Sequence, residues 1–218
     1  MQNRHTFDTY LRELRAKLMK MGGSMQKAMR NGVQSLKTLD NELAQQVVDG
    51  DREINALQHE IEDMCIRLIA TQQPVASDLR KIVAGMQIAI DLERMADLAV
   101  DIAKSTIRLN GQKLIKPLID IPKMAEILDK MISDALLAYV QSDVNLAAEL
   151  AKTDDEVDHL YRQIVEELFT ISHQQPEATP QAMTLSFVGR YLERIGDHAT
   201  NIGESTIFIV TGERSDLN

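Results

Sequence analysis

The chain has 218 residues, of which 44% are hydrophobic and 26% charged, and its aromatic side chains are four Phe and four Tyr with no Trp. This length and apolar fraction support one large domain or two small ones, and no stretch reaches the ~18 consecutive apolar residues of a membrane-spanning helix. The net charge of −9 argues against nucleic acid as a partner, because an acidic surface repels a phosphate backbone.

The N-terminal segment is expected to begin a long helix. Residues 1–14 (MQNRHTFDTYLREL) contain no apolar signal sequence, and the single cysteine, Cys65, can form no internal disulfide. Both features predict a cytoplasmic protein. Abundant Leu, Ala, Met, Glu and Gln favour helix over sheet. We expect the first helix to run from about Thr6 to Val48, with a kink or break at Gly22 and Gly23.

Two further helices are expected in the first half, after breaks near residues 49–51 and 72–77. Apolar residues recur at steps of three and four from Ile54 to Leu68, which predicts an amphipathic helix. A connector follows from Asn110 to Pro122 (NGQKLIKPLIDIP), because Asn-Gly ends helices and proline interrupts them. The second half shows the same plan, with breaks near residue 153 and residues 174–180. We place one domain at residues 1–112 and the other at residues 113–218.

The second half of the chain repeats the first. Residues 92–107 (LERMADLAVDIAKSTI) align without a gap on residues 192–207 (LERIGDHATNIGESTI), and nine of the sixteen positions are identical. Upstream, residues 51–61 align with 154–164, residues 72–74 (QQP) with 174–176, and residues 33–35 (VQS) with 140–142. The repeat predicts an all-α fold of two tandem homologous three-helix bundles, in which short connections make successive helices antiparallel.

The repeated block carries candidate metal ligands at four-residue spacing, which stacks them on one helix face. They are Glu93, Asp97 and Asp101 in the first half, and Glu193, Asp197 and Asn201 in the second. The apolar seam lies opposite, so we expect this stripe to face solvent. Counting from the turns places a second acidic set at similar height on the preceding helix: Asp51, Asp154 and Asp158. Carboxylates on adjacent helices are hard oxygen ligands suited to Mg²⁺, Ca²⁺, Mn²⁺ or iron.

A solvated helix face is the simpler interpretation of such a stripe, because charges at i,i+4 spacing are common on helices. Arg94 and Arg194, which follow the two glutamates, would neutralise part of it. However, the repeat keeps Glu, Arg and Asp while several apolar positions differ between the halves. Packing alone does not require that outcome, which favours a shared ligand or surface role.

The LERMAD and LERIGD blocks, the segment QQPVASDLR and the segment KMGGSM together resemble the PhoU family of bacterial phosphate regulators. The resemblance covers essentially the whole chain. It implies two similar three-helix bundles, each with an E/D-x-x-x-D motif that binds a multinuclear metal cluster, iron in some members, with Zn, Mn or Mg as alternatives. In this chain the motifs are Glu93/Asp97 and Glu193/Asp197. Because Asp101 aligns with Asn201, we expect the second site to hold fewer or more weakly bound ions.

The resemblance also implies a function as an adaptor rather than an enzyme. It implies that the protein couples the phosphate ABC transporter, through its ATPase subunit, to a membrane sensor histidine kinase, and that it restrains the kinase when phosphate is plentiful. We therefore expect negative regulation of phosphate uptake and starvation signalling, a homodimer, and contact with the membrane through partners only. Residues expected to contribute weakly to partner binding are Arg94, Arg194, Asp78 and Arg80.

Two alternatives remain open from the sequence. A ferritin-like di-iron oxidase needs two E-x-x-H motifs and two further Glu that point into a four-helix core. Here Glu156 and His159 form the only such motif, and the repeat lacks its counterpart. The other alternative is a plain helical scaffold without metal, in which the duplicated stripe is only a solvated face.

Overall fold

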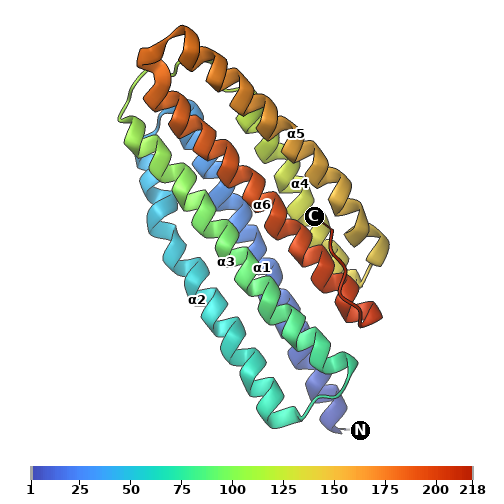
Figure 1. The fold of residues 1–218 in the computed structure, drawn as a ribbon. Coiled ribbons are helices and arrows are strands. Elements are labelled where there is room, and N and C mark those ends of the chain that lie inside the picture. The colour runs from blue at the N-terminus through green and yellow to red at the C-terminus, as the bar shows by residue number, and fades with distance from the viewer. Residues whose placement is uncertain (1, 218) are drawn as a thin grey trace.

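The computed structural model describes the backbone of residues 2–217 and the side chains of residues 7–217. Its helices are α1 (Gln2–Thr38), α2 (Asn41–Gln72), α3 (Ser77–Leu109), α4 (Asp120–Gln141), α5 (Val144–Gln174) and α6 (Thr179–Thr211), with a short 3-10 turn, η1 (Pro176–Ala178), before α6. Helices α1–α3 form one elongated bundle and α4–α6 a second beside it (Figure 1). The predicted all-α duplication is confirmed. No helix within residues 2–217 combines the length and apolar character needed to cross a membrane.

Helices α3 and α6 form the centre of the molecule. Each packs on the other two helices of its own bundle, and α3 and α6 also pack on each other, so each is covered on several sides. The predicted seam residues Leu92, Met95 and Ile102 are completely buried, as are Leu192 and Ile202. The apolar residues of α2 and α5 instead occupy one face each, which leaves an exposed face on these outer helices.

The first helix break differs from the predicted one. α1 ends at Thr38, and α2 then runs uninterrupted through residues 49–51. Asp40 starts α2, because its side chain accepts hydrogen bonds from the backbone N–H groups of Glu42 (3.0 Å) and Leu43 (2.9 Å). Gly22 and Gly23 cause no break. A Cβ at Gly22 would collide with Leu136 of α4, so this glycine permits close helix packing.

The second half has the same break at the corresponding place. Asp143 starts α5 by accepting from the N–H groups of Asn145 (3.0 Å) and Leu146 (3.1 Å), and α5 passes straight through Thr153. Ser142, which directly precedes this cap, has a left-handed φ of 57°, as Leu39 has at 55°. The predicted alignment of residues 33–35 with 140–142 is therefore wrong, because Leu39 is the counterpart of Ser142.

The breaks predicted near residues 72–77 and 174–180 are confirmed, since α2 ends at Gln72 and α5 at Gln174. The connector between the bundles spans residues 110–119 and contains the position at which we predict the domain boundary. Gln181 of α6 holds this connector by accepting from Ile115 N–H (2.6 Å) and donating to the Lys113 carbonyl (3.1 Å). The connector is thus fixed to the second bundle.

Candidate functional site

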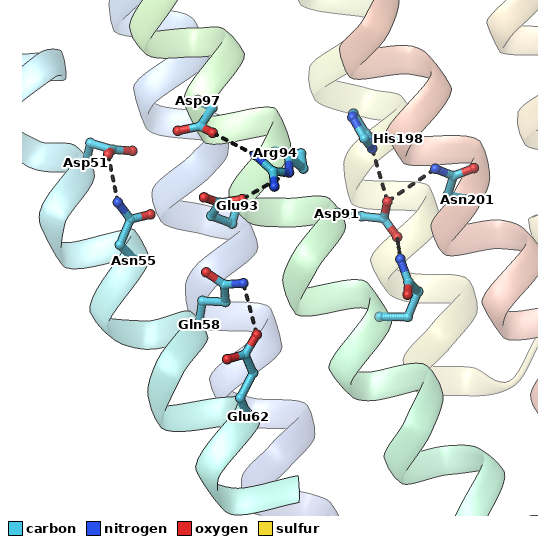
Figure 2. Close-up of polar contacts among 11 residues, drawn as sticks. Asp51, Asn55, Gln58, Glu62, Asp91, Glu93, Arg94, Asp97, His198 and Asn201 are labelled. Atoms are coloured by element: carbon cyan, nitrogen blue, oxygen red, sulfur yellow. Dashed lines mark hydrogen bonds and ion pairs between the residues drawn. The ribbon is translucent and has the colours of Figure 1, made fainter. Parts of the chain in front are cut away.

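The first carboxylate cluster lies between α2 and α3. Asp51 comes from α2, and Glu93 and Asp97 come from successive turns of α3 (Figure 2). Burial raises the pKa of Asp51, and the charge of Asp97 raises it further. Burial also raises the pKa of Glu93, followed by the effect of Asp97. The predicted equal height of Asp51 and Asp97 on neighbouring antiparallel helices is therefore confirmed.

The second cluster lies between α5 and α6 at the equivalent place and is more deeply buried. Asp154 and Glu193 are each only 9% exposed. Burial raises the pKa of Asp154 to about 7, and Asp197 and Asp158 add to that effect. Burial likewise raises the pKa of Glu193 to about 7, with Asp197 as the next cause. Four carboxylates thus lie within mutual electrostatic range without enough positive charge to balance them.

The expectation that this stripe faces solvent is wrong for Glu193, which is 9% exposed, whereas the side chains of Asp97 and Asp101 in the first half are 45% and 43% exposed. The acidic face of α6 turns toward α5, and Gly196 allows the contact, because a Cβ at Gly196 would lie 2.6 Å from Asp154 Oδ1. In the first half Ala96 occupies the equivalent position, and Asp51 there is less buried than Asp154. Helical spacing alone identified the shared face but not the neighbour that covers it.

Three carboxylate oxygens in these clusters are buried without a hydrogen-bond donor. Among the side chains that the structure describes, Asp51 Oδ1, Asp154 Oδ1 and Glu193 Oε2 have no hydrogen-bond partner. A buried anionic oxygen without a donor is costly. These oxygens are hard ligands, and a divalent cation would satisfy them. The donor chemistry of these residues therefore suits a metal cation.

Arginines occupy part of this space. Arg94 lies 3.6 Å from Glu93 Oε2 and 3.4 Å from Asp97 Oδ2 (Figure 2), and Arg190 forms an ion pair with Glu193. With the side chains arranged in this way, no group of three or more His, Cys, Asp or Glu within residues 7–217 is placed to hold a metal ion. The Arg190–Glu193 ion pair was not predicted from the sequence, although a separation of three residues is ordinary ion-pair spacing on a helix.

Asp101 and Asn201, the third turn of each stripe, make other contacts. Asp101 pairs with Lys104 at 3.5 Å. Asn201 donates to Asp91 Oδ1 at 3.2 Å, across the contact between α3 and α6. Thus neither residue is held against the clusters.

The residues expected to contact partners lie in two regions. Burial raises the pKa of Asp197, and Arg194, which follows Glu193, is among the basic groups that oppose this effect. Asp78 pairs with Lys81 at 3.0 Å near the start of α3. Arg80 lies beside Gly212, just after α6, and its Nε has no hydrogen-bond partner among the described side chains. The two arginines of the repeat and the pair at the start of α3 thus belong to different surfaces.

A buried polar contact between the two bundles was not predicted. Asp91 is 2% exposed and accepts hydrogen bonds from His198 Nδ1 at 3.0 Å and Asn201 Nδ2 at 3.2 Å (Figure 2). Gln87 Nε2 lies 3.5 Å from the other carboxylate oxygen. The repeat gave no signal, because Asp91 aligns with Tyr191. Sequence spacing cannot show that α3 and α6 face each other here.

The half-motif of a di-iron oxidase does not point into the protein. Glu156 and His159 are both exposed on α5. A ferritin-like centre needs ligands that project into a four-helix core. The structure therefore gives that alternative no support.

Comparisons with known proteins agree with the duplicated architecture. The family model described as PhoU domain matches twice, at residues 18–106 and 121–206. The chain is 43% identical to the phosphate-specific transport system accessory protein PhoU homolog of Clostridium acetobutylicum, over 99% of both chains, and 40% identical to that of Aquifex aeolicus, over 93% and 92%. Two crystal structures of PhoU match with a TM-score of 0.90 each. That from Pseudomonas aeruginosa is 36% identical and covers 95% of this chain and 100% of its own, and that from Streptococcus pneumoniae is 30% identical and covers 96% and 99%.

Proposed function

The chain belongs to the PhoU family, and on that premise we propose that it is a non-enzymatic accessory protein that regulates phosphate transport. The observation that carries the proposal is the full-length similarity to proteins named as phosphate-specific transport system accessory proteins. The similarity spans both repeats. An adaptor role requires binding surfaces rather than a catalytic centre.

The partners we propose are the ATPase subunit of the phosphate ABC transporter and the sensor histidine kinase of the phosphate response. In this account the chain acts in the cytoplasm and restrains both uptake and starvation signalling when phosphate is plentiful. It reaches the membrane only through these partners, and a homodimer is the expected assembly. Support comes from the family resemblance and from a long bundle whose outer helices α2 and α5 each leave a face exposed.

We also propose that both carboxylate clusters bind metal cations, with multinuclear iron, Zn, Mn or Mg as candidates. Asp51, Glu93 and Asp97 would hold the cation of the first half. In the second half the corresponding ligands are Asp154, Asp158, Glu193 and Asp197. The buried oxygens without donors support this assignment. A bound cation would supply positive charge and link α2 to α3 and α5 to α6, while Arg94 and Arg190 would be released from their present ion pairs.

Complementation tests the regulatory role. In a bacterium that lacks its own PhoU, a reporter of the starvation response should be active even in phosphate-rich medium, and this chain should switch it off. A variant with Glu93→Gln, Asp97→Asn, Glu193→Gln and Asp197→Asn should fail to do so at equal protein level. The matched control is Glu156→Gln with His159→Gln, on the exposed face of α5.

Each result decides a different part of the proposal. Failure of the unaltered chain to silence the reporter would contradict the regulatory role. Full silencing by the four-carboxylate variant would remove metal from the mechanism and leave the plain scaffold. Loss of silencing in the control variant would indicate that Glu156 and His159 contribute to function.

A further inference from the structure

An apolar groove runs between α5 and α6 on the surface of the second bundle. Its volume is about 390 Å³. Its lining includes Tyr161, Val165, Phe169, Met183, Phe187 and Arg190. Three of these side chains are largely exposed: Phe169 at 75%, Met183 at 56% and Phe187 at 49%. An exposed apolar patch of this kind marks an interaction site more often than a random surface does.

This groove contains much of the aromatic content of an aromatic-poor chain. The whole sequence has four Phe and four Tyr. Tyr161, Phe169 and Phe187 line the groove, and Tyr191 stacks on Phe187 with ring centroids 6.4 Å apart. Aromatic side chains bury large areas and act as anchors in interfaces. Here those anchors are presented on the surface.

The first bundle shows that the fold does not require these side chains. Buried and exposed positions recur in the same order along α3 and α6, and along α2 and α5. The counterparts of Tyr161 and Phe187 are Gln58 and Gln87. Gln58 donates to Glu62 at 3.0 Å, so this part of the equivalent face is polar (Figure 2). The aromatic groove is thus a property of the second repeat rather than of three-helix packing.

One end of the groove meets the second carboxylate cluster. Tyr161 lies one helical turn after Asp158 on α5, and Arg190 at the same end forms an ion pair with Glu193. Five carboxylates from these two helices gather beyond that point, namely Asp154, Asp155, Asp158, Glu193 and Asp197. Arg190, His198 and Arg194 oppose the charge of Asp197, so the carboxylates outnumber the nearby basic groups. The face is therefore apolar along its length and negatively charged at one end.

We propose that this groove binds an amphipathic helix of a partner protein, with its apolar side chains between α5 and α6 and with Lys or Arg side chains at the acidic end. Helices bind in this mode through apolar residues at i, i+3 or i+4 and i+7. The charges at one end would fix the direction of the bound helix and speed its association. The inference concerns the metal-free chain, in which the carboxylates of the second cluster supply the charge, and it does not depend on the phosphate role.

Two synthetic helical peptides of about five turns test the inference. Both carry the same leucine face, and one has two Lys residues at one end where the other has two Glu residues. Each is labelled with a fluorophore and titrated with the full chain in EDTA, and fluorescence anisotropy gives the Kd. We expect the Lys peptide to bind at least about tenfold more tightly than the Glu peptide, with the difference reduced at high salt.

Matched variants locate the binding. The double variant Phe169→Gln with Met183→Gln should raise the Kd of the Lys peptide at least about tenfold. Its folding should be unaffected, because both side chains are exposed. Ile66→Gln with Val83→Gln changes the equivalent, similarly exposed positions of the first bundle and should leave the Kd unchanged. Equal Kd values for both peptides, no binding, or equal effects of the two double variants would overturn the proposal. If the unaltered chain is a dimer and only the Phe169/Met183 double variant is a monomer, the groove is occupied by a second copy of the chain, and this result would also overturn the proposal.

Discussion

Gly196 and Asp158 distinguish the two carboxylate clusters at the level of single residues. Their counterparts in the first half are Ala96 and Asn55. In the second cluster Gly196 therefore lets the Asp154 carboxylate approach α6 closely, and Asp158 adds one more carboxylate. The expectation of a weaker second site rested on Asp101 and Asn201, which make other contacts. The burial of Asp154 instead favours the second site as the one that gains more from a cation.

Replacing Gly196 by Ala tests this close contact between Gly196 and Asp154. The added Cβ would lie 2.6 Å from Asp154 Oδ1, so the carboxylate must move. We expect the free energy of unfolding to fall by about 1–3 kcal/mol. Gly50→Ala is the control, because a Cβ there meets nothing within 4 Å, and it should raise the free energy of unfolding by about 0.5–1 kcal/mol. Urea denaturation measures both, and a gain in both variants would show that Asp154 is not held against Gly196.

Asp154 and Glu193 should make stability depend on pH when no cation is present. Their pKa values are raised to about 7 in the fold from ordinary values of 3.8 and 4.5, by burial first and by neighbouring carboxylates second. Between about pH 4 and 7 the folded chain therefore holds protons that the unfolded chain has lost, and stability falls as the pH rises through this window. Above that window the whole contribution is lost.

The corresponding measurement is Tm against pH in EDTA. We expect the contribution of these groups to fall by on the order of 2 kcal/mol between pH 5 and pH 8. Asp154→Asn should flatten the profile, whereas Asp49→Asn, at an exposed position of α2, should not. Identical profiles for the unaltered chain and for Asp154→Asn would contradict the assigned pKa.

At the scale of whole helices, the two N-cap aspartates set the breaks between successive helices. Asp40 and Asp143 each accept two backbone N–H bonds and occupy the same place in the repeat. Replacing either by Ala should lower the free energy of unfolding by about 1 kcal/mol, because two N–H groups lose their acceptor. Asp63→Ala, at an exposed mid-helix position, should change it by less than about 0.5 kcal/mol. Thermal or urea unfolding gives the comparison, and equal losses in all three variants would argue against capping.

Helix content, the duplication and the carboxylate positions could be predicted from periodicity and self-alignment. The first break in each half could not, because polar residues around Asp51 and Asp154 resemble a loop in sequence. In the structure both residues lie within continuous helices, since apolar residues such as Val47 and Ile54 keep a buried face on either side. The Asp91 contact could not be predicted either, because it depends on which helices of the two bundles meet.

At the scale of the whole molecule, the α3–α6 contact joins the two repeats and leaves their carboxylate clusters facing α2 and α5. Asp91 is the buried polar centre of that contact, with His198 and Asn201 as its donors from the other repeat. A change at Asp91 therefore affects how the two bundles are held together. Both clusters are fixed to this central helix pair, so movement between the bundles would alter their separation.

Replacing Asp91 by Ala should lower the free energy of unfolding by about 1–3 kcal/mol, because His198 and Asn201 lose their buried acceptor. Asp101→Ala is the matched control on the same helix, where the side chain is partly exposed and pairs with Lys104 at 3.5 Å. We expect that change to be below about 1 kcal/mol. Denaturation followed by far-ultraviolet circular dichroism measures both. Equal effects would mean that the contact between the bundles contributes no more than a surface ion pair.

We propose that the duplicated carboxylates are metal ligands in both halves. The most direct measurement is the metal-to-protein ratio of the purified chain by elemental mass spectrometry, compared with Glu93→Gln/Asp97→Asn, Glu193→Gln/Asp197→Asn and the four-residue combination. We predict that each pair removes part of the bound metal and that the combination removes nearly all of it, while Glu156→Gln/His159→Gln retains it. An unchanged metal-to-protein ratio in the four-residue variant would contradict this proposal. So would an unaltered chain that is purified without metal and whose Tm does not rise when cations are added.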